Sequence, residues 1–186
     1  SVVDEVQGLK ADIILISDDN FFTNPRRAEK ICDLLIQRKI KKRFLAQARI
    51  DIAQHPVLLK KLARAGFKAL FIGIESPHDR VLGHLNKGFD QAAIREAFAV
   101  LRKYPILTNG YFIYGNIGET EEEMLYIAQF AREIGVDTIS TNKLRIEKYS
   151  PLRELAEGAP GYHITDRGEL YSDDFSHARL KKIGKK

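Results

Sequence analysis

Polar residues that could bind a small ligand recur wherever an apolar stretch of this sequence ends. A carboxylate can hold an ammonium group or a ribose hydroxyl, and an arginine can bind a carboxylate through two parallel hydrogen bonds. In chain order these residues are Asp18, Asp19, Asn20, Gln47, Arg49, Glu75, Ser76, Gly115, Gly118 and Glu119. Each alone is also compatible with a loop cap or a structural ion pair, such as Arg49 with Asp51. Their succession favours one polar ligand site.

The segments that must position these residues predict an α/β fold with a parallel, open sheet. The unbroken apolar run Ile13–Ile16 is typical of a strand buried on both faces of a parallel sheet. Strand and helix patterns then alternate in units of about 30 residues, as βαβ construction requires. Ligands bind at the carboxyl ends of such strands. The predicted strands are 11–17, 43–48, 68–74, 106–114 and 137–146.

A glycine-rich turn joins the fourth predicted strand to its helix. Gly115 and Gly118 have no Cβ, so the backbone can turn sharply and a ligand can approach closely. Thr120 is a natural N-cap, with Glu123 three residues on to complete a capping box. Such a turn can direct backbone N–H groups at a ligand, and it can equally be an ordinary strand-to-helix loop.

The composition bounds the class of protein. The chain has 186 residues, of which 44% are hydrophobic and 30% charged, as in a globular domain. We expect residues 1–157 to form the strand–helix domain. Residues 158–186 are predicted to be an irregular extension with one short helix at its end. The apolar runs are of strand length and the start lacks a signal-peptide pattern, so we expect a cytoplasmic protein without a membrane contact.

The cysteine and histidine content argues against a metal site within this chain. Cys32 is the only cysteine, which excludes an internal disulfide and any multi-cysteine cluster. It falls in a predicted helix, where an inert buried thiol is expected. The five histidines do not show metal-ligand spacing. We assign no metal ligand and no catalytic residue.

Four segments in fixed order resemble the radical S-adenosylmethionine superfamily, especially its cobalamin-binding branch of Fe–S oxidoreductases and methyltransferases. They are Ile-Ser-Asp-Asp-Asn-Phe, Gln-Ala-Arg-Ile-Asp, Phe-Ile-Gly-Ile-Glu-Ser and Gly-Tyr-Phe-Ile-Tyr-Gly-Asn-Ile-Gly-Glu-Thr. The resemblance implies a partial (β/α)₆ barrel. It also implies S-adenosylmethionine and a [4Fe–4S] cluster held by a CxxxCxxC loop, which this chain lacks. We therefore expect a fragment with strands two to six, inactive alone, of an enzyme that generates a 5′-deoxyadenosyl radical.

The resemblance also implies roles for individual residues. Asp18, Asp19 or Asn20 would lie near the amino group of the cofactor, and Gln47 and Arg49 would face its methionine or the substrate. Glu75 and Ser76 would contact the ribose or the methionine carboxylate. The adenine would pack against Ile113, Gly115 and the Gly118–Glu119 turn. The segment 149–152 departs from the Pro-Gly-Thr of many relatives, which leaves the role of the last strand open.

Two alternatives remain open at the level of sequence. A flavodoxin-like receiver domain is suggested by Asp18-Asp19, although it needs an aspartate where Glu75-Ser76 stands. A non-catalytic nucleic-acid-binding module could use the lysine-rich end. In the favoured interpretation the partners are a small-molecule substrate of unknown identity and, in a preceding domain, cobalamin. An exposed sheet edge at Ile13–Ile16 would promote self-association.

Overall fold

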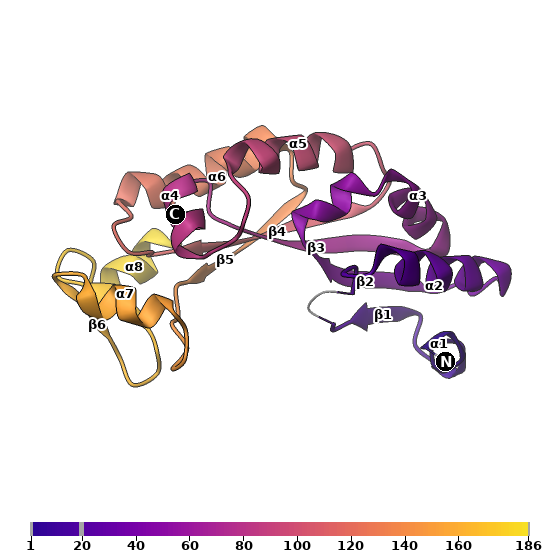
Figure 1. Cartoon of the computed structure of the whole chain (residues 1–186), viewed down its shortest axis with the longest axis horizontal. Helices are drawn as coiled ribbons and strands as arrows, with labels where there is room; N and C mark the ends of the chain where they lie inside the picture. Colours follow the sequence, from indigo (N-terminus) through magenta and orange to yellow (C-terminus); the bar gives the residue numbers. More distant parts are fainter. Residues whose placement is uncertain (1, 19–20, 186) are drawn as a thin grey trace. The chain divides into compact units, whose positions relative to one another are not determined.

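A computed structural model of the chain describes residues 2–18 and 21–185 (Figure 1). Its main sheet contains five parallel strands in an open arrangement, in the order β1-β2-β3-β4-β5. This confirms the predicted fold class. A flavodoxin-like receiver domain has the order 2-1-3-4-5, so that alternative is wrong. The strands are β1 (Ile13–Ile16), β2 (Arg43–Ala48), β3 (Phe67–Glu75), β4 (Leu107–Tyr114) and β5 (Thr138–Lys143).

Among the described residues no helix is both long and apolar enough to cross a membrane. Helices separate the strands along the chain. They are α1 (Val2–Gly8), α2 (Pro25–Gln37), the 3₁₀ helix η1 (Ile50–Gln54), α3 (Pro56–Ala65), α4 (Asp79–His84), α5 (Gln91–Leu101), α6 (Glu121–Ile134), α7 (Leu152–Gly158) and α8 (His177–Ile183). The chain divides into two compact units, which are described one at a time.

The first unit comprises the chain up to residue 73, with 94–110 and 134–138. Parallel pairing aligns Ile14 with Phe44 and Ala46 with Leu70, so these side chains share one face. Phe44, Ala46 and Leu70 are fully buried on that face. Helix α2 begins as its sequence predicts, because the Asn24 side chain accepts a hydrogen bond from the Arg27 N–H.

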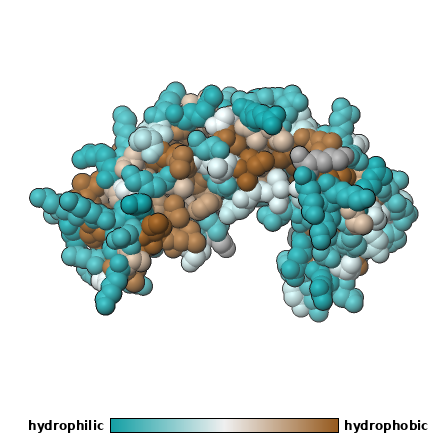
Figure 2. Space-filling model, turned by 180° about the vertical axis from the view of Figure 1, so that it is seen from behind, coloured by the Kyte–Doolittle hydropathy of each residue, from teal (hydrophilic) through white to brown (hydrophobic). Residues whose placement is uncertain are grey.

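The prediction that Ile13–Ile16 is buried on both faces is wrong, because β1 is the edge strand and its opposite face stays exposed. Ile13 and Leu15 are 55% and 59% exposed. Apolar surface, drawn in brown, is visible among the polar residues of the part of the molecule that carries β1, on the left of Figure 2. Large exposed apolar side chains on an edge strand favour association with another chain.

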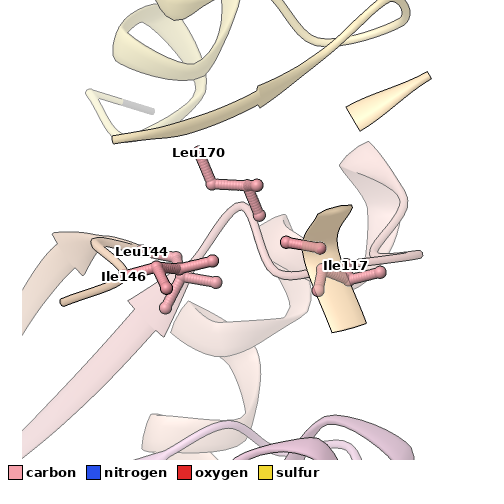
Figure 3. Packing of buried hydrophobic residues seen from close by; sticks show 5 residues of the cluster. Ile117, Leu144, Ile146 and Leu170 are labelled. Carbon is pink, nitrogen blue, oxygen red and sulfur yellow. The ribbon is translucent and has the colours of Figure 1, made fainter. Parts of the chain in front are cut away.

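The second unit comprises 74–93, 111–133 and 139–186. Its core includes a buried cluster of Ile117, Leu144, Ile146, Ala156 and Leu170. Figure 3 shows the side chains of Ile117, Leu144, Ile146 and Leu170 directed toward one another. Leu144 and Ile146 lie beyond the end of β5, which stops at Lys143 rather than at residue 146 as predicted. Leu144 still donates its N–H to the Tyr114 carbonyl oxygen at 2.9 Å, but the Ile146 N–H turns to the Gly168 carbonyl oxygen at 2.7 Å, so the chain departs from β4 there.

The last part of the chain is more ordered than the sequence predicts. Residues 158–186, predicted to be irregular apart from a terminal helix, also form β6 (Tyr162–Ile164) and β7 (Leu170–Ser172). The two strands pair antiparallel, and helix α8 buries Leu180 and Ile183. A three-residue strand is too short to show an alternating pattern, so this hairpin could not be predicted from hydrophobic periodicity.

Candidate functional site

The strand ends of the first unit carry three of the predicted site residues. Asp18 is exposed after β1, whereas the predicted residues Asp19 and Asn20 lie outside the described part of the chain. Gln47 is half-buried near the end of β2, and Arg49 follows it two residues on. Arg49 Nε lies 3.6 Å from Asp51 Oδ2, with both side chains largely exposed. An exposed pair of this kind contributes about 0–1 kcal/mol, so it holds the guanidinium only weakly.

Glu75, at the carboxyl end of β3 in the second unit, has an unusual backbone. Its φ angle is +71°, in the left-handed region that L-residues seldom adopt. The Ser76 N–H donates a hydrogen bond to the Ile74 carbonyl oxygen at 3.0 Å, so Glu75 is the central residue of a γ-turn with positive φ. This turn is rare and strained. Strain of this type is concentrated at ligand-binding and active sites, which supports the interpretation of Glu75 as a site residue.

The Glu75 carboxylate is held by Lys87. Lys87 Nζ lies 2.9 Å from Glu75 Oε1, and only 22% and 16% of the two side chains are exposed. Lys87 is positioned by the end of α4, where Asn86 adopts φ +49°. The Asn86 and Lys87 N–H groups donate to the Gly83 and Leu82 carbonyl oxygens. This is the Schellman arrangement, and it fixes the direction of the chain at Lys87.

Ser76 is used within the protein. It is fully buried, and its hydroxyl oxygen accepts a hydrogen bond from the His78 N–H at 3.1 Å. This bond ties the end of β3 to the start of α4. His78 Nε2 lies 3.1 Å from the Glu123 carbonyl oxygen, so this nitrogen carries the proton and donates. The predicted contact of Ser76 with the cofactor stays a prediction.

The glycine turn after β4 is built around a buried carboxylate. Glu119 is only 3% exposed, and its Oε2 accepts hydrogen bonds from Asn116 N and Nδ2 at 2.9 and 3.2 Å. Burial raises the pKa of Glu119, and the bonds from Asn116 oppose that rise. Glu119 Oε1 has no hydrogen-bond partner among the described residues. The buried Glu119 carboxylate therefore stabilises the turn through its hydrogen bonds with Asn116.

Ile113 and Gly115 flank the same turn. Ile113 is half-buried against the cluster of Figure 3, and its carbonyl oxygen accepts a hydrogen bond from Asn116 Nδ2 at 2.9 Å. Gly118 has φ +72°, and a Cβ there would lie 3.0 Å from Arg80 Nη1. Glycine at 118 thus allows an arginine to approach the backbone. Ile113, Gly118 and Glu119 lie in the same short segment as Gly115, which is buried with φ +76° and would place a Cβ 3.2 Å from Leu180 Cδ2.

Arg80 and Tyr162 fix this turn, and sequence reasoning did not identify either. Arg80 donates to the Ile117 and Gly118 carbonyl oxygens at 3.0 and 2.9 Å and pairs with the Glu123 carboxylate at 3.0 Å. The Gly118 N–H donates to the Tyr162 hydroxyl at 2.7 Å. The predicted capping box is also present, with Thr120 N–H to Glu123 Oε2 at 2.8 Å and Glu123 N–H to Thr120 Oγ1 at 3.2 Å. The Arg80 and Tyr162 contacts join residues more than 35 positions apart, so no local pattern could reveal them.

The residues of this chain do not fit an iron–sulfur cluster. Cys32 is fully buried in α2, and burial raises the pKa of its thiol to about 12, which disfavours the thiolate that metals bind. Within the described ranges, histidine, cysteine and acidic side chains do not form a group of three that could hold a metal ion. The thiolates that the family resemblance implies are therefore not found among the described residues.

Comparison with known proteins gives a consistent set of relatives. The model of the Radical SAM superfamily matches residues 1–131. An uncharacterized methyltransferase, PH0819 of Pyrococcus horikoshii, is 28% identical over 120 residues, which is 64% of this chain and 26% of that protein. The hopanoid C-2 methylase of Rhodopseudomonas palustris is 25% identical over 172 residues, which is 90% of this chain and 31% of that protein. The chain therefore spans about a quarter to a third of the length of these relatives.

A solved structure extends the similarity to the fold. The radical S-adenosylmethionine methyltransferase TsrM from Kitasatospora setae, with cobalamin and a [4Fe–4S] cluster bound, aligns with a TM-score of 0.74 at 20% identity. The alignment covers 87% of this chain and 33% of TsrM. At this identity the similarity concerns the arrangement of strands and helices.

Proposed function

The chain belongs to the radical S-adenosylmethionine superfamily, and from this premise we propose that it is the strand-two-to-six part of a cobalamin-dependent methyltransferase or oxidoreductase. The parent is an enzyme of this family, and the family uses S-adenosylmethionine and an Fe–S cluster. The nucleic-acid-binding alternative is not supported. In the proposed parent the cofactor supplies a 5′-deoxyadenosyl radical or a methyl group for transfer.

The observation that carries this proposal is the γ-turn at Glu75. A carboxylate displayed from a strained backbone at the carboxyl end of a parallel strand is suited to accept hydrogen bonds from an ammonium group or from ribose hydroxyls. Lys87 holds that carboxylate in one orientation through a hydrogen bond of 2.9 Å. We propose that Glu75 contacts the ribose or the methionine of S-adenosylmethionine.

The glycine turn supports a role in packing the adenine. Arg80 and Tyr162 occupy the carbonyl and amide groups at Gly118, so the turn is held in one conformation before a ligand arrives. We propose that Ile113 packs against the adenine, with Glu119 as the internal support of the turn, whereas Gly115 is buried against Leu180 and serves to turn the backbone. Asp18, Gln47 and Arg49 stay predicted contacts of the methionine or the substrate.

The remaining partners are also proposals. Because Cys32 cannot act as a cluster ligand, we place the cluster thiolates outside residues 1–186, together with any cobalamin site. We take residues 1–157 as the barrel part and 158–186 as an extension to it, in a cytoplasmic protein acting on a small molecule. Ile13 and Leu15 on the edge strand would support self-association.

The direct test is turnover of S-adenosylmethionine by the full-length gene product that contains this chain. Under anaerobic reduction, with its cluster in place, the protein should convert S-adenosylmethionine to 5′-deoxyadenosine or S-adenosylhomocysteine. Residues 1–186 alone are the control and should form neither. The assay is run with an intact cluster, a suitable reductant and cobalamin, both with and without added substrate. The proposal is refuted if the full-length protein leaves S-adenosylmethionine unchanged under these conditions.

A further inference from the structure

A basic groove lies in the second unit, away from the residues assigned to S-adenosylmethionine. The segment 145–149 and the turn 164–168 form its two walls, with Arg153 beside them, and its volume is about 560 Å³. Pockets that bind small molecules have volumes of about 300–1,000 Å³. On the right of Figure 2 the surface of the C-terminal part of the chain is mostly hydrophilic. The groove is therefore of the size of a small ligand.

Both walls of the groove are fixed by backbone contacts. The Ile146 N–H donates to the Gly168 carbonyl oxygen at 2.7 Å, and Arg145 pairs with Glu169 as an antiparallel bridge. Gly168 has φ +78°, and a Cβ there would lie 2.4 Å from the Ile146 carbonyl oxygen, so only glycine permits this approach. The Ile146 side chain is buried in the cluster shown in Figure 3. The groove is thus a preformed feature.

Cations outnumber acids along the groove. The charged residues that line it are Arg145, Lys148, Arg153, Arg167, Glu147 and Asp166. Arg145 Nε lies 3.4 Å from Glu147 Oε1, but 64% and 78% of these side chains are exposed, so water competes with the pair. In the part of the chain that the structure describes, Lys148 and Arg167 do not form an ion pair. Arg153 is paired with Glu157, whose Oε1 lies 2.9 Å from Arg153 Nε, so an anion entering the groove would be attracted mainly by Arg145, Lys148 and Arg167.

An aromatic ring stands at the same groove. Tyr149 lines it and is 89% exposed, a high value for a large aromatic side chain. Lys148 Nζ lies 5.6 Å from the centre of the Tyr149 ring, within the range of a cation–π contact. Exposed tyrosine rings offer a flat face on which a planar ligand ring can stack.

We propose that this groove binds a small anionic ligand with a planar ring, whose phosphate or carboxylate contacts Arg145 and Arg167 while its ring stacks on Tyr149. The arrangement uses guanidinium groups for a bidentate anion contact and an aromatic face for the ring. The groove does not include Glu75, Ile113, Gly115 or the Gly118–Glu119 turn. Its ligand-binding role is therefore independent of the proposed S-adenosylmethionine site.

Flavin mononucleotide is a suitable probe, because riboflavin carries the same ring without the phosphate and inorganic phosphate carries the anion alone. Binding to the chain of 186 residues is measured by fluorescence anisotropy of the flavin, with phosphate tested as a competitor. We expect flavin mononucleotide to bind about tenfold more tightly than riboflavin, the effect of one charge-assisted contact. Equal binding of the two flavins would overturn the proposal.

Variants assign the binding to the groove. Arg167→Ala should weaken flavin mononucleotide about tenfold, whereas Arg132→Ala, an exposed arginine on α6, should leave it unchanged. Tyr149→Ala should weaken both flavins and leave phosphate competition intact, while Tyr149→Phe keeps the ring and should bind as the parent does. Equal losses in Arg167→Ala and Arg132→Ala would overturn the proposal. Binding of a single-stranded oligonucleotide by a chain that does not bind flavin mononucleotide would also overturn the proposal.

Discussion

Glu75 is the residue at which backbone strain and side-chain function can be separated by substitution. Both Glu75→Ala and Glu75→Gly remove the hydrogen-bonded ion pair with Lys87, whose partners are mostly buried. A hydrogen bond to a charged group is worth about 1.5–3 kcal/mol, so we expect Glu75→Ala to lower the free energy of unfolding by about 2 kcal/mol. Glu75→Ala keeps an L-residue at φ +71°, at a cost of about 1–2 kcal/mol, and glycine removes that cost.

Glycine also increases the entropy of the unfolded chain, which offsets about 0.5–1 kcal/mol of this gain. We therefore expect Glu75→Gly to be about 0.5–1 kcal/mol more stable than Glu75→Ala. Urea unfolding followed by circular dichroism measures the difference, and a double-mutant cycle with Lys87→Met measures the ion pair separately. If the alanine variant is as stable as the glycine variant, the γ-turn does not hold Glu75 in a strained conformation.

Three further predictions concern the glycine turn and the cluster. Arg80→Met should lower stability by about 1–2 kcal/mol, since it removes hydrogen bonds to two carbonyl oxygens, and an effect no larger than that of Arg132→Met would contradict this. Because burial raises the pKa of Glu119, its protonated side chain stabilises the folded state at low pH. This stabilisation is lost as the pH rises through that pKa. Glu119→Gln should thus melt above the parent protein at pH of about 8, with a smaller gap at about 4, and a pH-independent gap would disprove it. Residues 1–186 reconstituted with iron and sulfide should show no cluster absorbance, and an absorbing product would mean that Cys32 is accessible.

The fold could be predicted because its signals are local and repeated. The apolar run Ile13–Ile16 and the N-cap at Asn24 each specify their own element, and the alternation of strands with helices then fixes a parallel sheet. The sequence pattern predicts an end for β5 three residues beyond the observed one, since the apolar residues Leu144 and Ile146 continue the alternation of a strand. What decides their place is burial against Leu170, and that contact is long-range.

The candidate site was only partly predictable for the same reason. The strand-end position of Glu75 could be read from the sequence, but its positive φ could not, because glutamate does not have a preference for that conformation. Lys87 reaches Glu75 because of the turn after α4. Arg80 reaches the carbonyl oxygen of Ile117 because Gly118 allows it to approach the backbone closely. The sequence thus indicated which residues end the strands, whereas Lys87 and Arg80, from the end of α4 and from α4 itself, determine how Glu75 and the Gly118 turn are held.

Binding of S-adenosylmethionine through Glu75, at the carboxyl end of β3, is the main proposal for the full-length protein. Its most direct test is the equilibrium dissociation constant of S-adenosylmethionine for the full-length protein with its cluster intact, in the parent form, in Glu75→Ala and in the control Glu122→Ala, an exposed glutamate on α6. We predict that Glu75→Ala weakens binding about tenfold or more with unchanged cluster absorbance, and that Glu122→Ala binds as the parent does. A Glu75→Ala protein that binds S-adenosylmethionine as tightly as the parent would contradict the account.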